Sequence, residues 1–322
     1  VHRHHILKQT IDIFLLTPCS TLRRPLRVDI IDEPGIDGGG ILREWLQLLC
    51  TELFSESSEY FVRTSSTQSD GYWIRPSSTR RTDCDLQHYV FFGKILGKVL
   101  LEGLVMNFRL CIPMLKHLLG YPLSMEDIQY VDEQIYTSVL FIHDYGQVED
   151  LSLNFAVANH ELIPNGSNIA VTESNKASYL ELVIKYYLID SVEHEMRCII
   201  EGLRSIIPDK ILHVFDFKEL DLVLSGQPHI DVIDWQTHSA VGMLLHHPEN
   251  ERMVIEWFWE IVKSLDQRGR SRLLQYVTGS AGLPVEGFSC LTSLDGNLQP
   301  FTIQLIETTP DTAMPYASTC FN

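Results

Sequence analysis

Apolar residues recur at spacings of three and four along most of the chain, which is typical of amphipathic helices. This spacing predicts helices over residues 6–16, 41–54, 91–106, 173–187, 216–224, 252–265 and 270–278. Short strands are predicted over residues 26–31, 151–158 and 301–306. The pattern therefore predicts a large, mostly helical part with short strands, followed by a small α/β part.

Polar residues between these segments predict turns and helix starts. Thr172 is the expected N-cap of the helix after it, and Asn165-Gly166 is typical of a tight hairpin turn. Three glycines at 38–40 precede a helix, but no lysine follows them and acidic residues surround them. A turn with positive φ angles is therefore a better interpretation than a phosphate-binding loop.

The most apolar segment, residues 91–106, carries Lys94, Lys98 and Glu102 at four-residue spacing. These charges form one stripe on a helix, so we expect a core helix with one solvated edge rather than a membrane segment. Gly93 and Gly97 would let another helix approach closely.

The composition limits which partners the chain is expected to bind and in which cellular compartment it is expected to lie. Lys and Arg total 25 against 42 for Asp and Glu, a formal net charge of −17 that argues against nucleic acid as the main partner. Seven scattered cysteines without a C-x-x-C pair favour reduced thiols in the cytoplasm or nucleus. We expect no metal and no cofactor, and the N-terminus shows no secretory signal.

One cysteine, Cys320, lies in the proline-punctuated terminal stretch "PYASTCFN". By itself a lone thiol is most often structural. Six stretches in order, however, resemble the HECT family of ubiquitin-protein ligases: "DEPGIDGGGILREW", "FFGKILGKVLLEG", "LIPNGSNIAVTESNKASYLELVIKY", "IEWFWEIV", "LLQYVTGSAGLPVEGF" and "PYASTCFN".

The resemblance implies a bilobal α+β fold. A large N-lobe would span 1–243, with a subdomain at roughly 123–190 that binds a ubiquitin-conjugating enzyme, and a small C-lobe would span 244–322. A hinge at Val241–Pro248 would let the lobes reorient. Family members usually continue past the cysteine with a further strand and tail, which this sequence lacks, so the resemblance leaves full activity open.

The resemblance also assigns the site. Cys320 would accept ubiquitin as a thioester from a conjugating enzyme and pass it to a lysine of a protein substrate. Thr319 could orient the cysteine or donate to the tetrahedral oxyanion. Val139, Ile142 and Tyr145 are the nominated contacts with the conjugating enzyme, and the alternative is that they are ordinary core residues.

Two alternative functions stay open at this point. The chain could be a catalytically incomplete HECT-like module that binds a conjugating enzyme or ubiquitin. It could also be a cysteine hydrolase, which would need a histidine beside Cys320. The aromatic run Trp257, Phe258 and Trp259 is expected to be core and interlobe packing rather than a ligand site.

Overall fold

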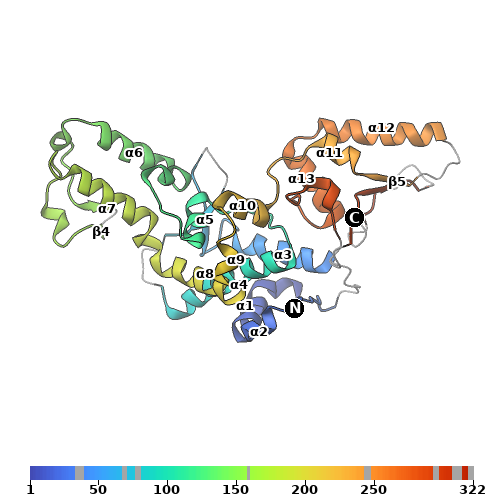
Figure 1. Ribbon diagram of the computed structural model, residues 1–322, viewed down its shortest axis with the longest axis horizontal. Helices are drawn as coiled ribbons and strands as arrows, with labels where there is room; N and C mark the ends of the chain where they lie inside the picture. Colours follow the sequence, from blue (N-terminus) through green and yellow to red (C-terminus); the bar gives the residue numbers. More distant parts are fainter. Residues whose placement is uncertain are drawn as a thin grey trace. The chain divides into compact units, whose positions relative to one another are not determined.

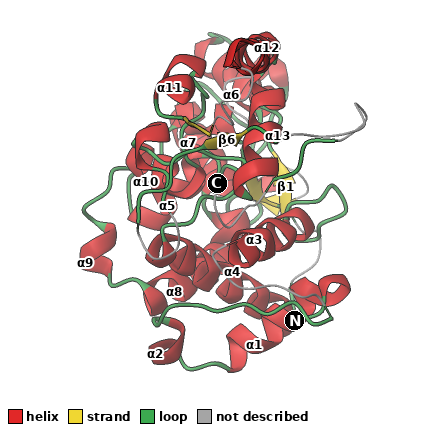
Figure 2. Ribbon diagram, turned by 90° about the vertical axis from the view of Figure 1, so that its right-hand side faces the viewer, coloured by secondary structure: helices red, strands yellow, loops and turns green. Residues whose placement is uncertain are grey.

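The computed structural model describes residues 1–32, 40–66, 71–76, 81–157, 160–242, 248–292, 297–306 and 314–317, and the structural statements below concern these residues. It confirms a helix-rich α+β fold, and Figure 2 shows how few of these residues lie in strands. The strands form three separate two-stranded sheets. No helix in these ranges combines the length and apolarity needed to cross a bilayer.

The chain separates into two compact units, each built from several stretches of sequence (Figure 1). Unit 1 comprises Val1–Leu53, Ile95–Phe108 and Glu219–Asn322, and unit 2 comprises Phe54–Lys94 and Arg109–Lys218. Helix α4 (Asp83–Glu102) contributes its first part to unit 2 and its last part to unit 1.

Helices dominate both units. The further helices of unit 1 are α1 (Ile6–Leu16), α2 (Cys19–Leu22), α3 (Gly40–Leu53), α10 (Phe217–Ser225, whose first two residues fall in unit 2), α11 (Val232–Thr237), α12 (Pro248–Ser264) and α13 (Gln267–Thr278). Those of unit 2 are α5 (Ile112–Leu119), α6 (Glu133–Asp144), α7 (Lys176–Leu188), α8 (Glu193–Ile206) and α9 (Asp209–Leu212). Short 3₁₀ helices span Arg3–His5, Met125–Tyr130, Val148–Leu151, Gly166–Asn168, Asp190–Val192 and Gly287–Cys290.

The strands pair only locally in unit 2 but over a long sequence distance in unit 1. In unit 2, β1 (Phe61–Arg63) and β2 (Tyr72–Ile74) are antiparallel, as are β3 (Ala156–Val157) and β4 (His160–Glu161). In unit 1, β5 (Ala240–Gly242) pairs in parallel with β6 (Thr302–Gln304). The parallel pair joins the stretch just before α12 to residues that follow the Gly287–Cys290 turn.

The core of unit 2 rests on apolar packing and on one close helix contact. Nine buried side chains from the 128–188 region form a continuous cluster. Where α4 meets α8, a Cβ added to Gly93 would lie 2.0 Å from the carbonyl oxygen of Ile199, and one added to Gly202 would lie 2.0 Å from that of Val90. The predicted close approach of a helix at Gly93 is therefore confirmed.

The predicted solvated edge of the 91–106 helix is wrong. Lys94 is only 7 % exposed and Lys98 only 2 %. The Lys98 ammonium donates to the carbonyl of Arg24 and to Glu102, so its charge is compensated inside unit 1. The helix also begins earlier than predicted, at Asp83, because Thr82 pairs with the Asp85 carboxylate there.

The predicted strand over residues 26–31 is also wrong. Val28 and Ile30 are buried as the pattern required, but the segment has no partner strand among the described residues. Its backbone groups pair instead with the Glu102 carboxylate, through Leu26 N–H, and with the backbone of Val1. A short apolar run specifies burial more reliably than it specifies strand pairing.

Two predicted local motifs differ from the structure. Helix α7 starts at Lys176 rather than after Thr172, because the Asn175 side chain accepts a hydrogen bond from Thr172 N–H and holds a preceding turn. Asn165 does adopt positive φ, at 60°, but Gly166 begins a 3₁₀ turn rather than a hairpin. The close packing of Gly166 against the carbonyl of Phe155 explains its need for glycine.

Candidate functional site

The proposed nucleophile Cys320 and its neighbour Thr319 lie outside the described residues, as do Ser318 and His246-His247. The structure does describe residues 314–317, a few positions before the cysteine. The Tyr276 hydroxyl, on α13, donates to the carbonyl of Pro315 at 2.6 Å. This bond connects the stretch that leads to Cys320 with a helix of unit 1.

An aromatic cluster lies in the core of unit 1. We use this name for Trp235 and the three rings that contact it, those of Trp259, Phe288 and Phe301. Trp235 is fully buried and stacks on Phe288 with ring centroids 4.8 Å apart. Trp259 and Phe301 meet it edge-on at 6.1 and 5.1 Å. The cluster joins α11, α12, the Gly287–Cys290 turn and the residue before β6 into one core.

Trp257, by contrast, is 56 % exposed, so the expectation that it is core packing is wrong. Phe258 is partly buried, and Trp259 is 4 % exposed. Three consecutive helical residues point in directions about 100° apart, so a helix that covers a core with one face cannot bury all three.

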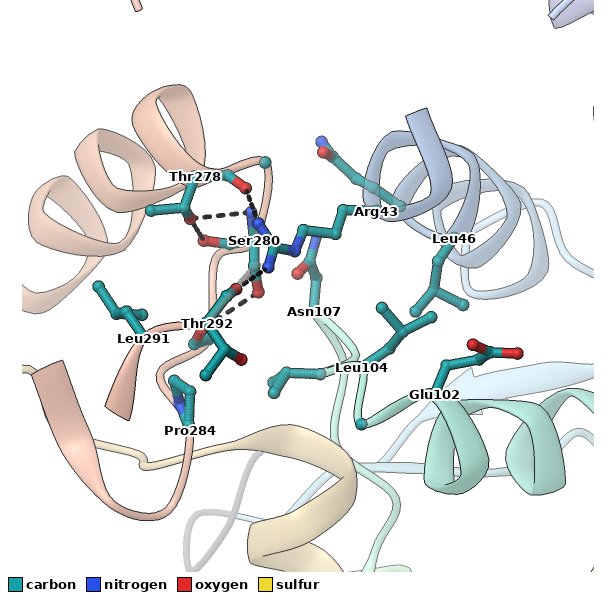
Figure 3. A pocket seen from close by; sticks show the side chains of 15 residues that line it. Arg43, Leu46, Glu102, Leu104, Asn107, Thr278, Ser280, Pro284, Leu291 and Thr292 are labelled. Carbon is teal, nitrogen blue, oxygen red and sulfur yellow. Dashed lines mark hydrogen bonds between the residues drawn. The ribbon is translucent and has the colours of Figure 1, made fainter. Parts of the chain in front are cut away.

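A pocket of about 180 Å³ lies between α3, the stretch after α4, and the residues that follow α13 (Figure 3). Arg43 reaches into it from α3 and donates to two backbone carbonyls, those of Thr278 at 3.2 Å and Thr292 at 2.6 Å. Asn107 accepts a hydrogen bond from the backbone N–H of Ala281 at 3.2 Å. These groups connect early and late parts of the chain within unit 1.

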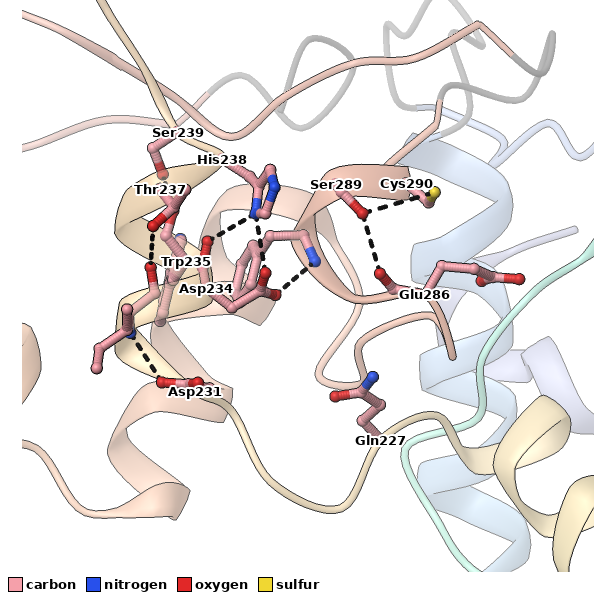
Figure 4. A network of polar contacts seen from close by, with 12 residues as sticks. Gln227, Asp231, Asp234, Trp235, Thr237, His238, Ser239, Glu286, Ser289 and Cys290 are labelled. Carbon is pink, nitrogen blue, oxygen red and sulfur yellow. Dashed lines mark hydrogen bonds and ion pairs between the residues drawn. The ribbon is translucent and has the colours of Figure 1, made fainter.

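A polar network fixes α11 to the Gly287–Cys290 turn (Figure 4). The Asp234 carboxylate accepts from the backbone N–H of Phe288 at 3.0 Å and lies 2.8 Å from His238 Nδ1. A Cβ added to Gly287, which has φ of 78°, would lie 2.7 Å from that carboxylate. The network therefore needs glycine at this position, and it holds the Phe288 ring against Trp235.

The six described cysteines are all free, and they differ widely in accessibility. Burial raises the pKa of the Cys50 and Cys111 thiols to about 12, so neither forms a thiolate near neutral pH. Burial also raises the pKa of Cys198. Cys84 is exposed, which makes it the natural comparison for any test of Cys320.

The nominated conjugating-enzyme contacts lie at different depths on and after α6. Val139 is 2 % exposed and belongs to the core of unit 2, so its side chain is not accessible to a partner in this structure. Ile142 packs partly against the same core. Tyr145 is half-buried and stacks on Phe141, whose ring is 55 % exposed, with centroids 5.2 Å apart.

The sequence reasoning missed Phe141 as an exposed apolar residue. The helical spacing could have shown this exposure, because positions 141 and 145 share one face of the helix while positions 139 and 142 share another. Both ends of α6 are held: the Asp132 carboxylate caps its first turn, and at the other end the Lys176 ammonium donates to the Tyr145 carbonyl at 2.8 Å.

Comparison with known proteins identifies the family. The family model described as HECT-domain (ubiquitin-transferase) matches residues 47–322. The chain is 33 % identical to E3 ubiquitin-protein ligase Smurf1 of Drosophila melanogaster, over all of this chain and 31 % of that protein. It is 32 % identical to E3 ubiquitin-protein ligase HACE1 of Xenopus tropicalis, over all of this chain and 35 % of that protein.

A third relative gives the same result. E3 ubiquitin-protein ligase ptr1 of Schizosaccharomyces pombe is 32 % identical over 92 % of this chain and 9 % of its own length. The chain therefore belongs to the HECT-domain family. It spans about a third or less of the length of these relatives.

Proposed function

We propose that this chain is the catalytic domain of a ubiquitin-protein ligase, which receives ubiquitin on Cys320 and transfers it to a lysine of a protein substrate. The observation that carries the proposal is the family match from residue 47 to residue 322, which includes the terminal cysteine stretch. The free thiols of the described cysteines agree with a reducing compartment, the cytoplasm or nucleus.

The proposed reaction has two acyl-transfer steps. The Cys320 thiolate attacks the thioester carbonyl between ubiquitin and the conjugating enzyme, and that enzyme's cysteine leaves as a thiolate. A deprotonated lysine amine then attacks the new thioester, the Cys320 thiolate leaves, and the nitrogen loses a proton as the isopeptide forms. The first step exchanges one thioester for another, so access and alignment matter more than a very low thiol pKa.

Thr319 has a supporting role in this proposal. Its hydroxyl would orient the sulfur or donate to the oxyanion of the tetrahedral intermediate. Thr319→Ala should then slow the transfer to lysine, measured as loss of preformed adduct in the presence of free lysine. Unchanged formation and discharge of the adduct would remove Thr319 from the mechanism.

The decisive experiment incubates the chain with a ubiquitin-charged conjugating enzyme and separates the products on non-reducing gels. We expect an adduct that disappears on treatment with thiol, is absent in Cys320→Ala and persists in Cys84→Ala. A folded wild-type chain that forms no adduct with any of a panel of conjugating enzymes would contradict the proposal and favour a binding module.

The conjugating-enzyme surface is proposed to centre on Phe141 and Tyr145, with Ile142 and Val139 beneath it. Phe141→Ala should slow adduct formation about tenfold or more while leaving the free energy of unfolding within about 0.5 kcal/mol. Val139→Ala should instead lower that free energy by roughly 1–3 kcal/mol, because it creates a core cavity. Val214→Ala, at a residue of the same unit that is 76 % exposed, is the matched control and should change neither.

We also propose that residues 1–243 and 244–322 act as two lobes joined at Val241–Pro248. Trp235 precedes this segment and packs against Trp259 and Phe301, which follow it. A rotation at this segment would have to break these ring contacts, so they oppose the proposed hinge and make its test decisive. His246→Pro should slow transfer and leave the unfolding midpoint in urea unchanged. Transfer at the wild-type rate would count against a hinge at this position.

A further inference from the structure

The C-terminal end of α13 has backbone carbonyls that its own helix cannot satisfy. The helix ends at Thr278, and Gly279 follows with φ of 75° and turns the chain away. Arg43 Nη1 donates to the carbonyl of Thr278 at 3.2 Å (Figure 3). A cation is favoured here because the carbonyl end of a helix has partial negative charge.

The same guanidinium makes a second bond to a different segment. Arg43 Nη2 donates to the carbonyl of Thr292 at 2.6 Å. Its two acceptors lie 235 and 249 residues away in sequence, on either side of the turn that contains Phe288. One side chain of α3 therefore holds two separate points of the segment 278–292.

A third hydrogen bond lies beside the first two. Asn107, after α4, accepts from the backbone N–H of Ala281 at 3.2 Å. We call Arg43, Asn107 and their three backbone partners the Arg43 latch. Close backbone contact accompanies it, since a Cβ on Gly282 would lie 2.4 Å from a methyl carbon of Val105.

We infer that the Arg43 latch positions the cysteine-bearing end of the chain for one of the two acyl transfers. Arg43 is a positioning residue in this inference, because it acts on the segment 278–292 and not on the reacting atoms. The inference rests on the proposed function, in which Cys320 must meet a conjugating enzyme in one step and a substrate lysine in the other.

The chemistry of the latch suits repeated opening. Arg43, Asn107, Thr278 and Thr292 line a pocket, so water can replace their hydrogen bonds when the groups separate. A hydrogen bond exchanged for water in this way contributes little net stability, and closing it again needs no repacking of a core. An arginine also supplies donors in a fixed planar fork, which fits two acceptors at once where lysine would present a single point charge.

The first test measures the latch itself, by hydrogen exchange of the backbone amides of residues 279–283 in the full chain. Arg43→Ala and Asn107→Ala should each raise exchange there about threefold to tenfold, the size expected for losing one or two ordinary hydrogen bonds. Arg3→Ala is the matched control. It removes the ion pair, at 2.8 Å, between Arg3 and Glu44, which follows Arg43 on α3. It should leave the exchange rates of these amides unchanged.

The second test separates the two chemical steps in single-turnover reactions. One reaction follows adduct formation from the charged conjugating enzyme, and the other follows discharge of the isolated adduct to free lysine. In Arg43→Ala the ratio of the two rates should change by at least about threefold. Arg43→Lys should restore part of the wild-type ratio because it retains the charge, and Arg3→Ala should retain the wild-type ratio.

The outcomes are distinct. Unchanged exchange at residues 279–283 in both Arg43→Ala and Asn107→Ala would overturn the latch. Raised exchange with both rates lowered by the same factor would overturn the positioning role and leave Arg43 as a structural residue. A wild-type chain that forms no adduct would contradict the proposed function, and the exchange measurement would still decide whether the latch exists. Should Arg43→Ala fail to fold, Asn107→Ala and Arg43→Lys decide by the same criteria.

Discussion

Two regions of unit 1 attach the late part of the chain to earlier residues, and they do so by opposite means. The aromatic cluster surrounds the fully buried Trp235 with three rings at centroid distances of 4.8–6.1 Å. The Arg43 latch uses three hydrogen bonds to backbone groups beside a pocket of about 180 Å³.

The difference indicates which contact can open at low cost. Separating the rings would return large apolar surfaces to water, and each buried aromatic side chain contributes several kcal/mol to stability. Separating the latch exchanges protein hydrogen bonds for water ones, at roughly 0.5–1.5 kcal/mol for each bond. We therefore expect the aromatic cluster to determine stability and the latch to determine position.

The largest expected effect comes from removing the centre of the cluster. Trp235→Ala should lower the free energy of unfolding by about 3–5 kcal/mol, measured by urea denaturation, because it leaves a large cavity. Trp257→Ala is the matched control and should cost about 0.5 kcal/mol or less, since that ring is 56 % exposed. Similar losses at the two tryptophans would contradict the assigned packing.

Trp235→Phe sharpens the same comparison. The indole nitrogen of Trp235 is buried and has no hydrogen-bond partner among the residues that the structure describes. Phenylalanine retains the ring contacts and removes this unpaired donor, so the loss should be much smaller than for alanine. A loss as large as that of Trp235→Ala would show that the N–H has a partner.

A smaller effect is expected where the backbone passes next to the latch. In Gly282→Ala the new methyl group would lie 2.4 Å from Val105 and 3.0 Å from the carbonyl of Ser225, so the segment must shift. We expect a loss of about 1–3 kcal/mol and faster exchange at the Ala281 amide. Gly146→Ala, where no atom lies within 4 Å of the added Cβ, should lose nothing and serves as the control.

The smallest effect concerns the buried thiol of Cys50 on α3, the helix that also carries Arg43. Burial raises the pKa of the Cys50 thiol from its ordinary value of 9.0 to about 12. Because the folded state holds the neutral thiol, its stabilisation is fully present below pH 9 and is lost as the pH rises from 9 towards 12. At pH 10 the expected loss is about 1.4 kcal/mol, one tenfold step in ionisation of the unfolded thiol.

The measurement for this prediction compares urea unfolding at pH 8 and pH 10 in wild type and Cys50→Ala. The alanine variant is less stable at both values but should lose less stability between them. Equal alkaline losses in the two proteins would show that the Cys50 thiol is not desolvated as the structure indicates.

The elements with a strong helical period could be predicted from the sequence. Helix α1 has the predicted bounds, and α3, α13 and β6 lie close to theirs. In these segments local propensity, apolar spacing and terminal residues all favour the same structure, and tertiary packing agrees with them. The family, too, could be recognised from ordered motifs.

The remaining features depend on partners that are distant in sequence. The Lys98 charge is buried because a carbonyl at Arg24 compensates it, and the acceptors of Arg43 lie more than 200 residues away. Periodicity assigns a residue to a face but does not show what covers that face. For this reason the sequence alone nominates Val139, which is buried, whereas Leu140 and Phe141 on the same helix are exposed.

The hydrogen bond from Tyr276 to the Pro315 carbonyl sets a limit on distance. Cys320 lies five positions after Pro315, and five Cα–Cα steps span at most about 17 Å. Under the proposed function, while the bond holds, a thioester that reacts with Cys320 would have to come within that distance, plus a side chain's length, of the Pro315 position beside α13. Tyr276→Phe would remove this one hydrogen bond, so the chain would be held only at an earlier residue. The thiol could then sample a larger volume without any change in the residues next to it.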